Sequence, residues 1–190
     1  EANLLAAQDD LNQALDVYRD GIHLFPEQGD RLYLGMVALL QRDGQDSAML
    51  ATLEEGLGAY PDSPDLWLVH VRTLDAVGRH EQALAQARLA DAHFQDREPE
   101  FPADDQDPMG DMLPPGHPLP QPPDSYLVEL ADFYVQQGEV QRGVDILAPL
   151  SEAGELNLTP SLWLARIYLG TGQLEAGSRL VESILVQWPE

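Results

Sequence analysis

The stretch GQDSAMLATLEEGLGAYP, Gly44 to Pro61, returns later in the chain as GQLEAGSRLVESILVQWP, Gly172 to Pro189. Each copy begins with glycine and ends with an aromatic residue followed by proline. Related copies begin in all at Asp9, Gly44, Gly78, Gly138 and Gly172. Two of the intervals between successive glycines, the first and the last, are 34 residues long. A period of this length predicts an array of stacked helical pairs.

The interval from Gly78 to Gly138 is 60 residues, about 26 more than one repeat. The excess contains DMLPPGHPLPQPPD, residues 111 to 124. Proline has no amide hydrogen and its ring clashes with the preceding helical turn, so this stretch is neither helix interior nor central strand. The sequence therefore predicts repeats 1–3 over residues 1–95, an acidic, proline-rich insertion over 96–123 and repeats 4–5 over 124–190. Because the period resumes after the insertion, we expect one continuous stack of repeats.

The insertion carries apolar side chains that predict attachment to the repeats. They are Phe101, Met109, Met112, Leu113 and Leu119. Apolar groups left in water without a partner are unfavourable, so we expect them to dock on the helical surface. The alternatives are a surface loop without a role and a proline-rich ligand for an external domain.

Each repeat is expected to form two helices. The segment DLWLVHVRTLDAVG, residues 65 to 78, is apolar along one helical face, and a second helix is expected over Glu81–Phe94. The repeated glycine ends the first helix, because glycine readily adopts the left-handed conformation needed there. Pro149 falls inside a predicted helix and is expected to kink it. Small residues that let neighbouring helices approach closely are Ala14, Ala83, Gly143 and Gly177.

Capping residues mark the expected starts of the first helices. Ser63 and Thr159 each precede a proline, which predicts an N-cap followed by proline in the first turn. Asp30 and Asp124 are the expected N-caps of the equivalent helices.

This pattern resembles the tetratricopeptide repeat (TPR) family over nearly all of the chain outside the insertion. Besides the period and the turn glycines, the matching positions are Ala131, Ala165, Tyr134 and Tyr168 in the first helices, Ala14 and Ala83 in the second, and Pro26, Pro61 and Pro189 at repeat ends. Departures from the family pattern are His70-Val71, Gln95 and Glu155. The resemblance implies an all-α, right-handed helix-turn-helix superhelical solenoid of about five TPR-like repeats, the first truncated, with one proline-rich insertion.

The resemblance also implies a concave groove, lined by the first helices, on which a partner protein or peptide binds. By register, the groove residues are Asn3, Arg31, Leu34, Gln41, Asp65, Leu68, Arg72, Asp75, Val128, Asp132, Gln136, Leu162 and Arg166. Three arginines would thus face one groove, and arginine binds carboxylates through a planar two-donor fork. The implied ligand is a peptide with acidic and apolar side chains. Alternatively, the arginines pair with nearby carboxylates, for example Arg72 with Asp75 one turn away.

The composition disfavours several classes of partner. The chain of 190 residues has 33 acidic and 10 basic residues, all of the latter arginine, and a net charge of −23 at pH 7. Such a surface repels phosphate and anionic lipid, so nucleic acid and membrane surfaces are not expected partners, and solubility is the simplest explanation of the charge. The absence of cysteine excludes disulfides, thiol catalysis and thiolate metal sites. A soluble protein of a bacterial cytoplasm or periplasm is the expectation.

No pattern of catalytic or metal-binding residues emerges, so we expect a non-catalytic protein without cofactor or metal. His70 falls on a predicted buried face, where a core histidine with satisfied hydrogen bonds is expected. Asp105, Asp107 and Gly110 have the spacing of a calcium loop, but Met109 and Gly116 stand where ligands are needed. No two histidines have the helical spacing of a metal-ligand pair with a third ligand nearby. The histidines are His23, His70, His80, His93 and His117.

The final segment LVESILVQWPE predicts an apolar end. Trp188, with Leu180, Ile184 and Leu185, is expected to form a patch that seeks cover. We therefore expect either that the chain is part of a longer protein or that it self-associates through this end. A structural spacer or oligomerisation segment of a larger assembly is the corresponding alternative to a peptide-binding scaffold.

Overall fold

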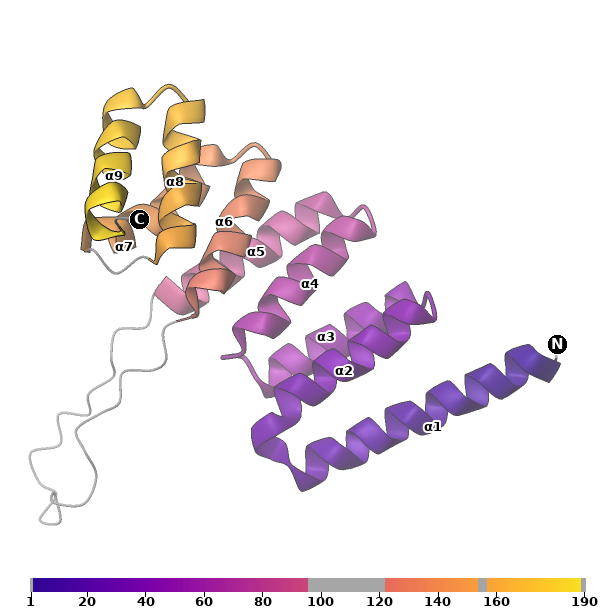
Figure 1. Cartoon of the computed structure of the whole chain (residues 1–190). Coiled ribbons are helices and arrows are strands. Elements are labelled where there is room, and N and C mark those ends of the chain that lie inside the picture. The colour runs from indigo at the N-terminus through magenta and orange to yellow at the C-terminus, as the bar shows by residue number, and fades with distance from the viewer. Residues whose placement is uncertain (1, 96–121, 154–156, 189–190) are drawn as a thin grey trace, which may run out of the picture. The chain divides into compact units, whose positions relative to one another are not determined.

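The computed structural model describes residues 2–95, 122–153 and 157–188, and their side chains over 11–94, 122–151 and 157–188. Every regular element in these ranges is helical, which confirms the all-α fold (Figure 1). The elements are α1 (Ala2–Leu24), the short 3-10 helix η1 (Pro26–Gln28), α2 (Gly29–Arg42), α3 (Asp46–Ala59), α4 (Pro64–Ala76), α5 (His80–Gln95), α6 (Asp124–Gln136), α7 (Val140–Ala153), α8 (Leu158–Gly170) and α9 (Leu174–Gln187). The expected docking of the insertion concerns residues 96–121, which lie outside the described part of the chain.

The helices belong to two compact units, Glu1–Ala87 (unit 1) and Arg88–Glu190 (unit 2). Within unit 1, consecutive helices pack against one another from α1 to α4, and within unit 2 the same holds from α6 to α9. That the two units continue one stack remains a prediction.

The repeated glycines end the first helices as the sequence predicts. Gly44, Gly78, Gly138 and Gly172 have φ angles of 71°, 79°, 84° and 80°. In each turn the amide of the following residue donates to the carbonyl five positions earlier, for example Glu139 to Tyr134 at 2.8 Å. This is the hydrogen bond of a Schellman motif, which requires the left-handed conformation at the glycine.

Close approach of helices within a pair is also confirmed. A Cβ placed on Gly143 of α7 would lie 2.7 Å from the carbonyl oxygen of Ala131 on α6. A Cβ on Gly177 of α9 would lie 2.7 Å from a methyl group of Leu169 on α8. A larger side chain at Gly143 would force α6 and α7 apart, whereas one at Gly177 would displace the Leu169 side chain.

The N-terminal region differs from the expected truncated helical pair. α1 is one helix of 23 residues that passes through Asp9 without a turn. The other repeats have glycine at this position, and Asp9 has a Cβ that makes the left-handed turn costly. The helix therefore continues where the other repeats turn.

The capping predictions are only partly correct. Ser63 is the N-cap of α4 with Pro64 in the first turn, as expected. Asn157, rather than Thr159, is the N-cap of α8, and Pro160 is accommodated within the first turn, where no intrahelical amide bond is required. Gln28 and Pro123 occupy the N-cap positions of α2 and α6.

Asp30 and Asp124 instead link successive repeats. Asp30 accepts a hydrogen bond from Ser63 Oγ at 3.1 Å, and Asp124 accepts one from Asn157 Nδ2. Both pairs join residues 33 apart and connect the first turn of one helix to the N-cap of the first helix in the next repeat. The aspartates thus join helices across repeats, while their charge still favours the helix N-terminus.

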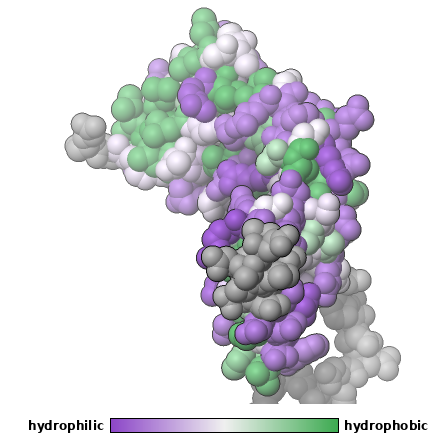
Figure 2. Space-filling model, turned by 90° about the vertical axis from the view of Figure 1, so that its right-hand side faces the viewer, coloured by the Kyte–Doolittle hydropathy of each residue, from purple (hydrophilic) through white to green (hydrophobic). Residues whose placement is uncertain are grey.

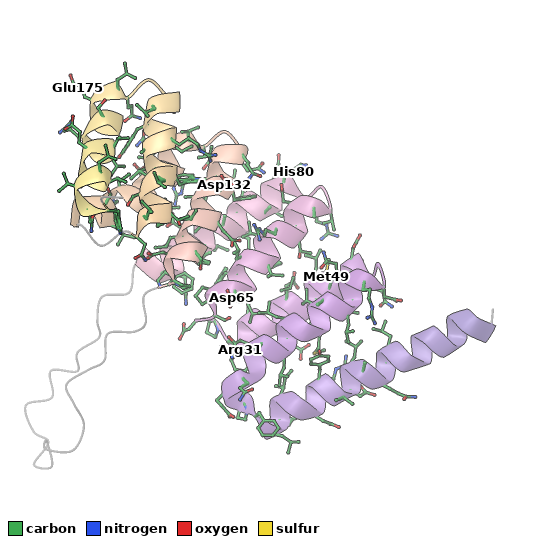
Figure 3. All side chains as sticks on the ribbon, viewed as in Figure 1. Arg31, Met49, Asp65, His80, Asp132 and Glu175 are labelled. Carbon is green, nitrogen blue, oxygen red and sulfur yellow. The ribbon has the colours of Figure 1, made fainter. Side chains whose placement is uncertain are left out.

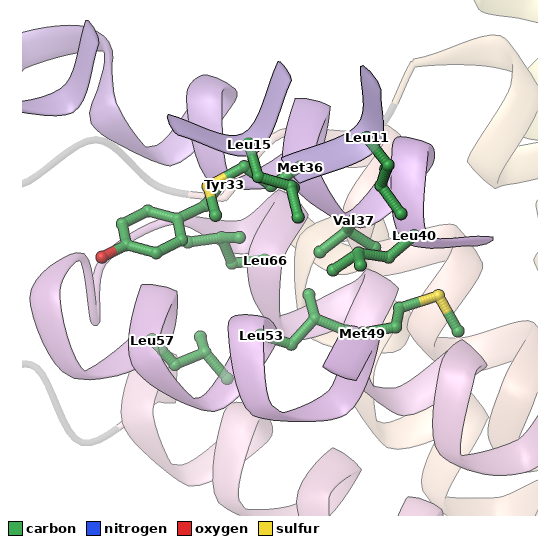
Figure 4. Packing of buried hydrophobic residues seen from close by; sticks show 10 residues of the cluster. All are labelled: Leu11, Leu15, Tyr33, Met36, Val37, Leu40, Met49, Leu53, Leu57 and Leu66. Atoms are coloured by element: carbon green, nitrogen blue, oxygen red, sulfur yellow. The ribbon is translucent and has the colours of Figure 1, made fainter. Parts of the chain in front are cut away.

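A contiguous apolar core holds unit 1 together (Figure 4). Its buried residues come from four helices: Leu11 and Leu15 of α1, Tyr33, Met36, Val37 and Leu40 of α2, Met49, Leu53 and Leu57 of α3, and Leu66 of α4. In unit 2 the larger buried side chains are Tyr126, Leu130, Phe133 and Tyr134 of α6, Val144, Ile146 and Leu147 of α7, Trp163 and Leu164 of α8, and Ile184 of α9. α7 includes Pro149, and a kink there remains a prediction.

Candidate functional site

Asp132 on α6 is the centre of a polar cluster between the two first helices of unit 2, which pack side by side (Figure 3). Its Oδ2 accepts a hydrogen bond from Gln136 Nε2 at 2.6 Å, and its Oδ1 accepts one from Trp163 Nε1 at 3.2 Å. Arg166 Nη2 of α8 lies 4.0 Å from Oδ1. The structure therefore brings together three of the predicted groove residues, Asp132, Gln136 and Arg166.

Arg166 remains largely open to solvent. Its side chain is 71% exposed, and 4.0 Å is too long for a hydrogen bond to Asp132. The nearby carboxylate attracts the guanidinium by charge, and the high exposure of Arg166 leaves the N–H donors at the edge of the guanidinium plane accessible. A ligand carboxylate could approach that edge.

The same side of α8 exposes leucines. Leu162 is 50% exposed and Leu169 44% exposed, and Leu158 is exposed as well. Positions 158, 162, 166 and 169 are spaced by about one helical turn each and lie along one side of the helix. We call Leu158, Leu162, Arg166 and Leu169 the α8 face.

The α8 face combines apolar contact area with a single cation. Val128 of the neighbouring α6 is half-buried and adds to the apolar character on that helix. In Figure 2 hydrophobic side chains gather in the upper part of the view, which contains α8 and α9. Exposed apolar area bordered by polar residues is typical of surfaces that bind another molecule.

The predicted groove residues of unit 1 have mixed environments. Arg31, Gln41, Asp65 and Arg72 are exposed, and Arg31 and Asp65 lie in the first turns of α2 and α4 (Figure 3). Asp75 is half-buried and forms a 2.6 Å hydrogen bond with the His80 ring.

Two predicted contact residues of unit 1 contribute to packing. Leu34 is half-buried against the unit 1 core, and Leu68 is buried. The side chain of Asn3 lies outside the described residues. Arg31 and Arg72 belong to unit 1 and Arg166 to unit 2, so a single groove containing all three remains a prediction.

Solved structures show which known fold these helical pairs match; no protein-family model and no curated protein sequence matches the chain. The nearly identical TPR-like repeats assigned to a Podosopora anserina kinesin light chain align with a TM-score of 0.53 at 17% identity, over 95% of this chain and 88% of that one. YrrB, described as a TPR protein with an unusual peptide-binding site, aligns with a TM-score of 0.52 at 14% identity, over 100% and 84%. The chain has a TPR fold. A TPR protein from Parabacteroides merdae ATCC 43184 aligns with a TM-score of 0.54 at 12% identity, over 96% of this chain and 62% of that one.

His70 stands at a position where the TPR sequence pattern usually has leucine. The structure corrects the expectation that its ring has hydrogen-bond partners. His70 is 5% exposed, as expected for a core position. Neither of its ring nitrogens has a hydrogen-bond partner, contrary to the expected satisfied histidine. Burial lowers its pKa, and the charge of Glu54 opposes that shift.

Sequence analysis missed a partly buried ion pair in unit 2. Asp91 of α5 is buried and accepts a hydrogen bond from Arg142 Nη2 of α7 at 2.9 Å. The Arg142 guanidinium also lies 5.5 Å from the centre of the Tyr134 ring. Arg88 of α5 pairs with Glu139 next to it. Both ion pairs join residues 51 apart across the insertion, so the repeat period could not align them.

Within the described residues, no group of three metal-ligating side chains comes together and no helix is long and apolar enough to cross a membrane. The calcium-like spacing at Asp105, Asp107 and Gly110 lies outside the described part of the chain, as does His117.

Proposed function

We propose that the chain is a non-catalytic protein-interaction scaffold that binds a peptide segment of a partner protein across the first helices of its repeats. The single observation that carries this proposal is the α8 face, where exposed leucines flank an accessible arginine. Burial of exposed leucine contributes about 25 cal/mol for each Å² removed from water, which favours an apolar partner at this surface.

The ligand chemistry follows from Arg166. A guanidinium presents two parallel donors that match a carboxylate, so an acidic side chain between apolar ones fits the α8 face. Asp132 lies 4.0 Å from Arg166, so its charge favours a guanidinium on this side of α8. The similarity to YrrB, described as having an unusual peptide-binding site, supports peptide binding by the same fold.

The net charge of −23 opposes the binding of an acidic peptide, because like charges repel over a long range. At physiological ionic strength the Debye length is about 8 Å, so direct contact with Arg166 outweighs the distant charges. The same net charge disfavours nucleic acid, which carries a dense array of phosphates.

An array of fluorescent heptapeptides tests the ligand chemistry directly by anisotropy at 0.15 M salt (about physiological). Peptides with leucine on both sides of one central glutamate should bind the full chain. Replacement of the glutamate by glutamine should weaken binding about tenfold, as expected for the loss of a hydrogen bond between charged groups. A preference for lysine at the central position would contradict the proposal.

Self-association through α9 is a second candidate. Leu185 and Val186 are 65% and 82% exposed, whereas Ile184, expected in the apolar end patch, is buried and packs inside unit 2. Trp188 is half-buried. Sedimentation tests this candidate by comparing the wild type with a Leu185→Ser, Val186→Ser variant. Self-association through α9 requires that the wild type forms a concentration-dependent dimer and that the variant does not.

A further inference from the structure

A pocket of about 360 Å³ lies between α5, α6 and α7, within unit 2 and formed by helices other than α8. Its walls are mainly apolar, and it falls in the size range of small-ligand sites. The lining residues are Asp91 and Phe94 of α5, Pro122, Tyr126, Leu127 and Leu130 of α6 and its approach, and Asp145, Ile146, Pro149 and Leu150 of α7.

The polar groups of the pocket are predominantly acceptors. Asp145 is exposed, and its Oδ1 accepts a hydrogen bond from Gln141 Nε2 at 2.8 Å. The backbone carbonyl of Asp145 would normally accept the amide hydrogen four residues later, but that residue is Pro149, which has none. Asp145 thus has two acceptors without an intrahelical donor, Oδ2 and the backbone carbonyl oxygen, one turn before Pro149 in α7.

Tyr126 supplies an independent observation. It lines the pocket and is 2% exposed, and its hydroxyl has no hydrogen-bond partner. A buried hydroxyl without a partner costs about 1–3 kcal/mol relative to a satisfied one, so this wall of the pocket is polar but unsatisfied. Phe94 packs edge-on against the Tyr126 ring with 5.3 Å between the ring centroids, and both rings form part of the pocket wall.

We propose that this pocket receives a lysine side chain of a partner protein, with the aliphatic stem along Leu130 and Ile146 and the ammonium at Asp145. Long basic side chains bury an apolar stem and keep a charged end near polar groups, which matches this combination of walls and acceptors. The chain itself contains no lysine, so the side chain comes from another protein.

An ammonium fits Asp145 better than a guanidinium does. Gln141 Nε2 already donates to Oδ1, so an arginine fork would have to share that oxygen, whereas an ammonium binds Oδ2 alone. Arg142 pairs with the neighbouring Asp91, so among the described residues Asp145 is the carboxylate of the pocket without a cation partner. A small polyamine fits less well, because its several charges would face the apolar walls.

Isoleucine methyl signals provide a local readout, because the isoleucines at positions 22, 146, 167 and 184 are spread over different helices and only Ile146 lines the pocket. The full chain, labelled with ¹³C at isoleucine methyl groups, is titrated with acetyl-Ala-Lys-Ala-amide. The Ile146 signal should shift in a saturable way while the Ile22 signal stays fixed. The same peptide with norleucine, which keeps the stem and lacks the charge, should shift Ile146 at least about tenfold more weakly.

The variant Asp145→Asn should weaken binding of the lysine peptide about tenfold, and the control Glu175→Gln on α9, which removes the same charge elsewhere in unit 2, should leave it unchanged. Equal effects of the two variants, or equal binding of the norleucine peptide, would overturn the proposal. Tighter binding of acetyl-Ala-Arg-Ala-amide or of 1,4-diaminobutane than of the lysine peptide would overturn the assignment to lysine. If the Ile146 signal shifts with none of these probes, the pocket is not a binding site for any of them and the proposal is wrong.

Discussion

At the scale of single residues, His70 is a polar side chain that is buried between helices. Its ring nitrogens are buried and unpartnered, and burial lowers its pKa. The unfolded chain therefore binds a proton near the ordinary histidine pKa of about 6.5, while the folded protein does so only at lower pH. As pH falls below about 6.5, the unfolded state gains protons first and the free energy of unfolding decreases.

The variant His70→Leu should remove this contribution to the pH dependence. It should also raise the free energy of unfolding at pH 7 by about 1–3 kcal/mol, because no unsatisfied polar group remains buried. Urea unfolding followed by far-ultraviolet circular dichroism at pH 7.5 and 5.5 measures both effects. His23→Gln, an exposed replacement, is the control, and an unchanged pH dependence in His70→Leu would contradict the account.

The sequence revealed that His70 is buried, since the helical period places it on the inner face of its helix. It could not reveal that the ring lacks partners, because those would come from other helices. The pair Asp91–Arg142 shows the same limit, since contacts across an insertion depend on three-dimensional packing.

At the scale of helical elements, two glycines in helices have opposite roles. Gly143 faces the carbonyl oxygen of Ala131, whereas a Cβ at Gly58 of α3 would meet open space. Gly143→Ala should therefore destabilise the protein by about 1–3 kcal/mol through overpacking. Gly58→Ala should stabilise it by about 0.5–1 kcal/mol, because alanine loses less backbone entropy in a helix.

Urea unfolding of each variant against the wild type measures the two changes, and each variant serves as the control for the other. A neutral effect of Gly143→Ala would show that α6 and α7 can separate at no cost. That result would contradict the role assigned to the small residue in each helical pair.

Element ends were predictable wherever glycine fixes the backbone. The four turn glycines all adopt positive φ, and the pattern of one glycine per repeat was sufficient to place these turns. The N-caps were less predictable, because Asp30 and Asp124 bond to the next repeat rather than to their own helix. The missing turn at Asp9 follows from the same rule, since that copy lacks the glycine.

At the scale of the whole molecule, the repeat period identified the fold, and the structural similarities to TPR proteins agree with it. The candidate site was predicted in part. Register placed Asp132, Gln136 and Arg166 on neighbouring helices, where the structure brings them together. Register could not show that Leu68 is buried or that the pocket beside Pro149 exists, since both depend on how side chains fill the space between helices.

The central claim is that the α8 face binds a peptide with apolar and acidic side chains. The most direct test is the dissociation constant of the best glutamate-centred peptide for a Leu162→Ser, Arg166→Ala variant. The matched control is Leu185→Ser, Arg179→Ala, which makes the same changes at exposed positions of α9. We predict that the α8 variant binds at least about a hundredfold more weakly, through loss of one apolar contact and one charged hydrogen bond, and that the control binds as the wild type does. Equal affinity of the two variants would contradict the claim.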